Sequence, residues 1–177
     1  MADVVALLQE MFDGDGARDY LGESVTQAVH MLQTGGLALD AGAPDHLVVA
    51  AVLHDVGHFS AADPMGDSDN HHDAAGADLL ARWFPPGVTE PVRLHVAAKR
   101  YLCATDPAYM RLLSPASVHT LGHQGGPMDD AEWAALEANP HWADAVAVRR
   151  WDDTAKDPDA PVPEFATFAP AIVAVSR

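Results

Sequence analysis

Residues 44–58 read PDHLVVAAVLHDVGH, and this stretch decides the fold class. Its centre, residues 47–53, is an apolar run with no polar face. Such a run is compatible with a buried strand, but Pro44 at the start and the two alanines in the middle favour a helix. The sequence therefore predicts a buried helix over residues 44–57.

Helical patterns continue on both sides of this segment, separated by Gly- and Pro-containing stretches. Gly35 and Gly36 could interrupt or bend one of them. We expect further helices over residues 3–12, 23–40, 71–84, 91–102, 129–138, 141–156 and about 165–175, with short helical turns between 107 and 121. The predicted fold class is all-α, with one domain over residues 1–177.

Composition excludes several classes of function. The chain has 177 residues, 10 Lys+Arg and 26 Asp+Glu, and its formal net charge of −16 would repel a nucleic-acid backbone. The longest apolar run is too short to span a membrane and the N-terminus lacks a signal-peptide pattern, so we expect a cytoplasmic protein. Cys103 is the only cysteine, which excludes a disulfide framework and a Cys-based zinc site. The oligomeric state is left open.

The chain contains ten histidines, and their positions indicate a metal site. His54 and Asp55 end the most buried predicted helix, where such a pair is costly unless it is satisfied or binds metal. Asp55 could use both carboxylate oxygens to bridge two ions, and His58 lies one turn beyond His54. The alternative is a buried histidine beside a capping aspartate.

Further candidates lie on four other predicted helices. Each alone fits a satisfied core residue, but together they add four possible ligands in the chain order His30, His72, His95 and Asp152. Mixed nitrogen and oxygen ligands suit iron, manganese or zinc. His71 precedes His72, so either could be the ligand, and the spacing to residues 76–78 favours His72.

Basic residues concentrate beside two of these candidates. Lys99 is one helical turn from His95, and Lys99-Arg100 with Arg149-Arg150 account for four of the ten basic residues. In so acidic a chain, this indicates an anionic substrate. The alternative is a solvated basic face, and only one of the two arginines at 149–150 is needed.

A carboxylate and an aromatic ring precede His30. On one helix, Glu23 would share a face with His30 at a separation of roughly 10 Å. Glu23 could then pair with a substrate ammonium, and Tyr20 could offer its ring face to the same cation. The alternative is an ordinary acidic helix N-terminus.

The order of these residues resembles that of the HD-domain metalloproteins, in which the two extra histidines mark members with two metals. Five further stretches are similar to the phosphonate-degrading HD-domain oxygenases, over about residues 19–168: DYLGE (19–23), HVAAKRYL (95–102), LSPAS (113–117), QGGPM (124–128) and RWD (150–152).

The resemblance implies a mixed-valent Fe(II)/Fe(III) centre that uses O2 in phosphonate degradation. The expected reaction cleaves the C–P bond of a small 1-hydroxyphosphonate, either 2-amino-1-hydroxyethylphosphonate or its N-trimethyl analogue, to a carboxylic acid and phosphate. A metal-dependent HD-domain phosphohydrolase acting on a phosphomonoester or nucleotide is the alternative, because the same ligands would serve it.

The resemblance also implies a role for each matched residue. One iron would be held by His30, His54, Asp55 and Asp152, and the other by Asp55, His72 and His95. Asp55 and His58 would take part in catalysis. The implied substrate contacts are Tyr20, Glu23, His58, Lys99, Ser117, Gln124 and Arg149.

Overall fold

The residues that the structure describes, 3–14, 16, 23–60 and 71–177 of a computed structural model, fold into helices joined by loops, which confirms the all-α prediction. In chain order the helices are α1 (Val4–Asp13), α2 (Gln27–Asp40), α3 (Asp45–Leu53), η2 (Val56–Ser60), α4 (His72–Leu80), α5 (Pro86–Thr105), α6 (Pro107–Met110), α7 (Pro115–His123), α8 (Asp130–Leu136), α9 (Trp142–Thr154), η3 (Phe165–Phe168) and α10 (Ala169–Val175).

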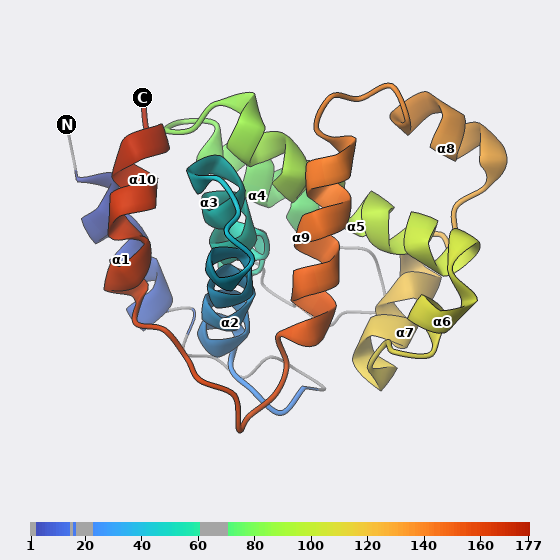
Figure 1. Cartoon of the computed structure of the whole chain (residues 1–177), viewed down its shortest axis with the longest axis horizontal. Helices are drawn as coiled ribbons and strands as arrows, with labels where there is room; N and C mark the ends of the chain where they lie inside the picture. Colours follow the sequence, from blue (N-terminus) through green and yellow to red (C-terminus); the bar gives the residue numbers. More distant parts are fainter. Residues whose placement is uncertain (1–2, 15, 17–22, 61–70) are drawn as a thin grey trace.

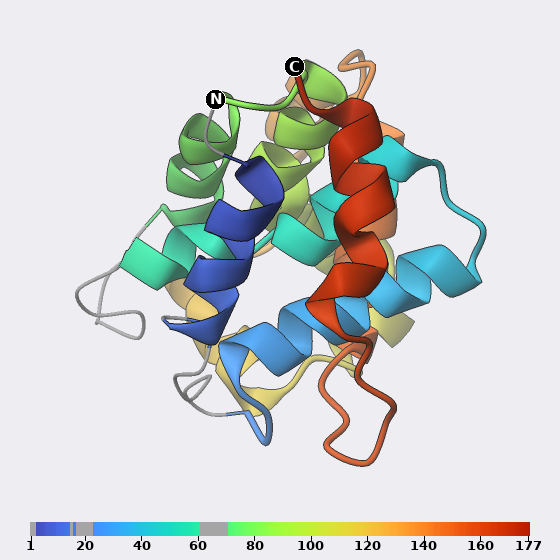
Figure 2. The same cartoon turned by 90° about the vertical axis from the view of Figure 1, so that its left-hand side faces the viewer.

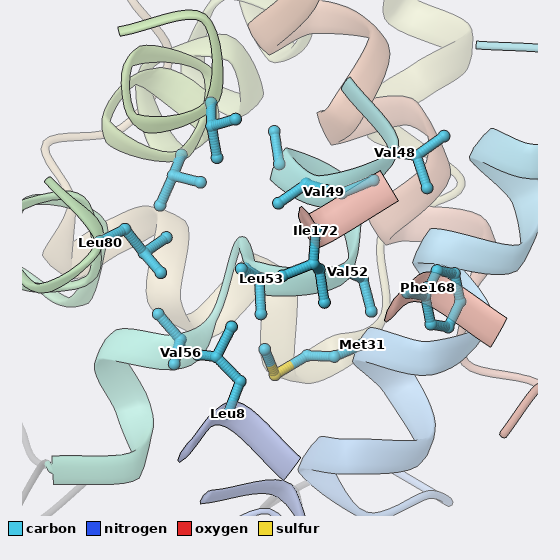
Figure 3. Close-up of a cluster of buried hydrophobic side chains, with 14 of the residues drawn as sticks. Leu8, Met31, Val48, Val49, Val52, Leu53, Val56, Leu80, Phe168 and Ile172 are labelled. Atoms are coloured by element: carbon cyan, nitrogen blue, oxygen red, sulfur yellow. The ribbon is translucent and has the colours of Figure 1, made fainter. Parts of the chain in front are cut away.

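The apolar run at residues 47–53 forms α3, and all seven of its side chains are buried. Figure 3 shows Leu53 among Leu8 of α1, Met31 of α2 and Ile172 of α10. Burying one such side chain stabilises the fold by about 1.5–3 kcal/mol. The α3 helix is therefore the centre of the hydrophobic core.

The other helices surround α3 in a fixed arrangement. In Figure 1, α2, α3 and α9 lie at the centre, and α5 packs against both α3 and α9. At one end α1 and α10 lie side by side, as Figure 2 also shows, while α6, α7 and α8 occupy the opposite end. The predicted metal ligands lie on these central helices or directly after α3, except for His72, which is on α4.

The α2 and α5 helices begin elsewhere than expected. The α2 helix begins at Gln27 rather than at residue 23, because Thr26 is extended and its Oγ1 accepts the N–H of Val29 at 3.2 Å. The α5 helix begins at Pro86 rather than at residue 91, since a proline suits the first helical position and Pro91 removes only one later hydrogen bond.

The glycine pair in α2 does not interrupt that helix, which continues to Asp40. A Cβ atom at Gly35 would lie 2.7 Å from the ring of Phe168 and 2.8 Å from Val52. The missing side chain therefore allows α2, α3 and η3 to approach closely.

The α3 helix ends at Leu53, four residues earlier than predicted. The side chain of His54 explains this end, because its Nδ1 bonds at 2.9 Å to the carbonyl of Ala51, the acceptor that a continuous helix would offer to the N–H of Asp55. A turn at residues 54–55 then leads into η2, so His54 and Asp55 lie just beyond a helix end.

Within the described residues, no helix has both the length and the apolar content needed to cross a lipid bilayer.

Candidate metal centre

The six predicted metal ligands lie close together in the interior. They come from α2, the end of α3, α4, α5 and α9, and all six are buried: His30, His54, Asp55, His72, His95 and Asp152. His72 is the first residue of α4, whereas His71 is exposed and has a positive φ of 48°. Of the two alternatives left open by the sequence, His72 is the one that faces the cluster.

One group of side chains surrounds oxygen Oδ2 of Asp55. The Nε2 atoms of His30 and His54 lie 3.7 and 3.5 Å from this oxygen. Asp152 belongs to the same group. Its Oδ1 lies 3.3 Å from Nε2 of His30, and its Oδ2 lies 3.7 Å from Nε2 of His54.

A second group surrounds the other oxygen of Asp55. The Nε2 atoms of His72 and His95 each lie 3.4 Å from Oδ1. The carboxylate of Asp55 therefore lies between two clusters of ligand atoms, with one oxygen facing each.

Backbone contacts orient three of the four imidazoles. Nδ1 of His30 lies 2.6 Å from the carbonyl of Ala155, and Nδ1 of His54 and His95 lie 2.9 and 2.7 Å from the carbonyls of Ala51 and Val92. A carbonyl oxygen only accepts, so each Nδ1 carries a proton, and Nε2 of each ring is the nitrogen that faces the cluster and would bind a metal.

The donor set fits metal ions. The Nε2 atoms of His30 and His54 lie 3.2 Å apart, and those of His72 and His95 lie 3.1 Å apart. Two lone pairs at that distance repel unless a cation lies between them. Ligand atoms about 2.0–2.2 Å from a metal are separated by about 3.0–3.5 Å, which matches these distances. Among the described residues, Oδ1 of Asp152 is also buried without a hydrogen-bond partner.

Electrostatics keeps both carboxylates ionised. Burial alone would raise the pKa of Asp55, but His54, together with His72 and His95 beside the carboxylate, lowers it well below its usual value. Burial likewise opposes ionisation of Asp152, and Arg149 and Lys156 lower its pKa.

The pKa values of two histidines, His54 and His72, shift in opposite directions. For His54, burial favours the neutral ring, but Asp55 and Asp152 raise its pKa overall. Burial, together with neighbouring His58, lowers the pKa of His72 to about 3, so this ring is neutral at pH 7 and ready to bind a cation.

His58 lies against the second group. Its ring stacks on that of His72 with the centroids 3.9 Å apart, and Asp55, His58 and His72 offer ligand atoms within 4.8 Å of one another. Burial lowers the pKa of His58, and the histidines around it act in the same direction.

Arg149 points into the site, and Arg150 is exposed. Nη1 of Arg149 lies 2.5 Å from Oδ2 of Asp152, and its other nitrogens bond to Asp153 and to the hydroxyl of Tyr109, which itself donates to Asp153. The guanidinium thus holds Asp152 in place. Sequence reasoning missed Asp153, although it lies four residues after Arg149, and it missed Tyr109, because no local pattern connects residue 109 to α9.

Lys99 and Ser117, two of the predicted substrate contacts, lie side by side. Nζ of buried Lys99 donates to the carbonyl of Ser117 at 3.3 Å and to Oγ1 of Thr120 at 2.9 Å. Burial lowers the pKa of Lys99 to about 7, and the charge of Arg149 adds to this effect.

Glu23 lies near the cluster, but its contacts differ from those predicted. Because α2 begins at Gln27, the predicted shared helix face of Glu23 and His30 is wrong. Oε1 of Glu23 instead accepts a hydrogen bond from Oγ of Ser114 at 2.5 Å and lies 3.5 Å from Nζ of Lys156. Lys156 is a third residue that sequence reasoning missed, although its i,i+4 spacing to Asp152 was a usable signal.

One other predicted substrate contact, Gln124, has no described hydrogen bond or ion pair to this cluster. Gln124 follows the last residue of α7, about 10 Å along the helix from Ser117. Its side-chain oxygen is buried and has no hydrogen-bond partner among the described residues. Tyr20 lies outside the described residues.

Gly57 allows α4 to carry His72 close to Asp55. A Cβ atom at Gly57 would lie 2.0 Å from the carbonyl oxygen of His72 and 2.8 Å from the backbone nitrogen of Gly76. Both of these are backbone atoms of α4, so a side chain at residue 57 would force α4 itself to move.

We therefore expect Gly57→Ala to lower the free energy of unfolding by about 1–3 kcal/mol or more and to reduce metal content. Urea denaturation and metal analysis measure the two effects. Gly122→Ala in α7 is the matched control, because its Cβ meets nothing within 4 Å and should stabilise the helix by about 0.5–1 kcal/mol. Equal stability of the two variants would contradict the prediction.

The fold and the cluster together define an all-helical protein whose helices converge on a buried histidine and aspartate metal-binding site. No family profile matches the chain. Its sequence is 45% identical over 174 residues to the 1-hydroxy-2-(trimethylamino)ethyl phosphonate dioxygenase (glycine-betaine-forming) of Leisingera caerulea, covering 96% of this chain and 89% of that relative.

Two further relatives agree with this match. A hydroxymethylphosphonate dioxygenase of Gimesia maris is 43% identical over 161 residues, covering 87% of this chain and 79% of the relative. An uncharacterised protein of Acanthamoeba polyphaga mimivirus is 34% identical over 152 residues, covering 82% and 69%. The chain belongs to the family of HD-domain phosphonate dioxygenases, and it is an oxygenase with a metal cofactor.

Proposed function

We propose that this oxygenase uses O2 and two iron ions, in the mixed-valent Fe(II)/Fe(III) state, to cleave the C–P bond of a small 1-hydroxyphosphonate. The reaction R–CH(OH)–PO3H2 + O2 → R–COOH + H3PO4 balances in atoms. It also balances in electrons, because the four that reduce O2 come from the substrate. The names of the two dioxygenase relatives support this reaction.

The position of Asp55 carries the proposal. Each of its two oxygens lies 3.4–3.7 Å from two imidazole Nε2 atoms, which suits one bridging carboxylate between two ions. Four imidazoles and two carboxylates form a mixed nitrogen and oxygen set that suits iron. When bound, the iron pair would supply the redox chemistry that activates O2.

The cationic groups beside the ligands would bind the phosphonate. Lys99 and the N-terminal turn of α7, which contains Ser117, offer an ammonium and a hydroxyl next to His95. Arg149 adds a guanidinium on the side of Asp152. We propose that these groups orient the substrate with its phosphorus toward α7, and that Gln124 completes the contact.

His58 would handle a substrate proton. Its lowered pKa leaves the ring neutral at pH 7, so one ring nitrogen can accept a hydrogen bond from the hydroxyl at C1. The buried helical surroundings would exclude water from the reacting atoms. Glu23 would face the end of the substrate that is distal from phosphorus. We propose the same for Tyr20, because it matches a substrate-contacting position of the family.

Oxygen dependence tests the proposal directly. Iron-loaded protein is mixed with hydroxymethylphosphonate, 2-amino-1-hydroxyethylphosphonate and its N-trimethyl analogue, in air and under argon, and O2 uptake and phosphate are measured. We expect one phosphate released per O2 consumed from at least one substrate, and none under argon. Iron analysis and spectroscopy should find about two irons per chain.

A phosphomonoester and a nucleotide serve as the contrasting substrates in the same assay. Phosphate released from either of them at equal rates in air and under argon, with no turnover of the phosphonates, would identify a hydrolase instead.

A further inference from the structure

Lys156 places an ammonium group at the edge of the candidate site. It follows the C-cap of α9, and only 11% of its side chain is exposed. Nζ donates to Oγ of Ser117 at 3.1 Å and lies 3.5 Å from Oε1 of Glu23 and 3.6 Å from Oδ1 of Asp152. The ammonium of Lys156 therefore connects Glu23, which would face the distal end of the substrate, to Ser117, which would bind the phosphonate.

Lys156 forms an ion pair with Glu23, and it also lies 3.6 and 3.9 Å from carboxylate oxygens of Asp152 and Asp153. Asp152 and Asp153 both pair with Arg149, which uses its guanidinium nitrogens on them. Glu23 lies close to Lys156 instead, and the hydroxyl of Ser114 holds its carboxylate in position. The side chain of Glu23 is only 8% exposed, so water screens the pair weakly.

We propose that Lys156 is a specificity-determining residue: its ammonium offsets the charge of Glu23 and favours substrates without a cationic nitrogen over those that carry one. A substrate ammonium beside Glu23 would approach Lys156 as a like charge, so it must share the carboxylate or displace the lysine. A nitrogen-free phosphonate leaves the pair undisturbed. The inference rests on the proposed function for its substrate class.

A ratio of two substrates measures this effect. 2-Amino-1-hydroxyethylphosphonate and 1-hydroxyethylphosphonate differ only in the amino group, so the ratio of their kcat/KM values cancels general losses of activity. In the iron-loaded full chain, Lys156→Met should raise the ratio of amine to nitrogen-free substrate by roughly tenfold, the size expected for one partly buried charge contact.

Three variants act as controls. Lys156→Arg keeps the charge and should change the ratio by no more than about twofold. Arg150→Met removes a cation from the exposed side of α9, where it faces Asp106 at 3.7 Å, and should leave the ratio unchanged. Glu23→Gln should lower the ratio, and Lys156→Met should have little further effect once Glu23 is neutral.

Binding measurements keep the proposal testable if turnover is lost. The dissociation constants of the two phosphonates, measured by titration calorimetry on wild type, Lys156→Met and Lys156→Gln, give the same ratio without catalysis. An unchanged or lower ratio in both variants overturns the role of Lys156, even if wild type releases phosphate from both substrates. If wild type binds both compounds but oxidises neither, the proposed function fails, and the binding ratio still decides the role of Lys156.

Discussion

Asp55→Ala is expected to lose both metal ions and all oxygenase activity, because the two oxygens of this carboxylate face two different groups of ligand atoms. Metal content should fall from about two ions per chain to well below one. His95→Ala removes a side chain that faces only Oδ1 of Asp55. This variant should therefore lose about one ion and keep the other.

Elemental analysis of protein loaded under identical conditions measures these losses. Asp78→Ala is the matched control, because it removes an exposed carboxylate that pairs with Arg93 at 2.6 Å, and it should retain both ions. If Asp55→Ala keeps two ions per chain and full activity, the shared carboxylate is not a bridge.

Lys99→Met should weaken phosphonate binding while leaving the metal content nearly intact, because Lys99 contacts α7 and not the six predicted ligands. Loss of one buried charge-assisted contact costs about 1.5–3 kcal/mol, which corresponds to roughly 10- to 150-fold in the dissociation constant. Calorimetric titration with hydroxymethylphosphonate measures this change. Unchanged affinity would show that the phosphonate binds elsewhere.

The same residue predicts a pH dependence. Since burial and Arg149 lower the pKa of Lys99 to about 7, its side chain is cationic below that pH and neutral above it. Phosphonate affinity should therefore fall as pH rises through 7 in wild type. The phosphonate itself ionises in a nearby range, so the wild-type profile is divided by that of Lys99→Met. A flat quotient would contradict the assignment.

Much of the candidate centre was predictable, since a histidine or aspartate in a buried helix must be satisfied. The apolar neighbours of His30, His54 and His95 in the sequence predict that these side chains are buried, without knowledge of the fold. Lys99 was found from its helical spacing to His95, and the same spacing from Asp152 would have found Lys156.

What the sequence could not predict depends on tertiary contacts. The hydroxyl of Thr26 caps α2, so the helix begins at Gln27. Glu23 therefore lies before the helix, whereas its predicted role assumed that it shares a helix face with His30. The hydroxyl of Tyr109 in α6 bonds to Asp153 and Arg149 in α9, and no spacing rule connects residues 44 and 40 positions apart in the chain.

The bond between Nδ1 of His30 and the carbonyl of Ala155 joins residues 125 positions apart. A chain still being synthesised cannot orient this imidazole until the residues after α9 have emerged and docked. Chain entropy opposes such long-range closure until the hydrophobic core has formed. We therefore expect the group that contains His30 and Asp152 to bind its metal only after the C-terminal part of the chain has docked, whereas the ligand atoms of the second group all come from residues 55–95.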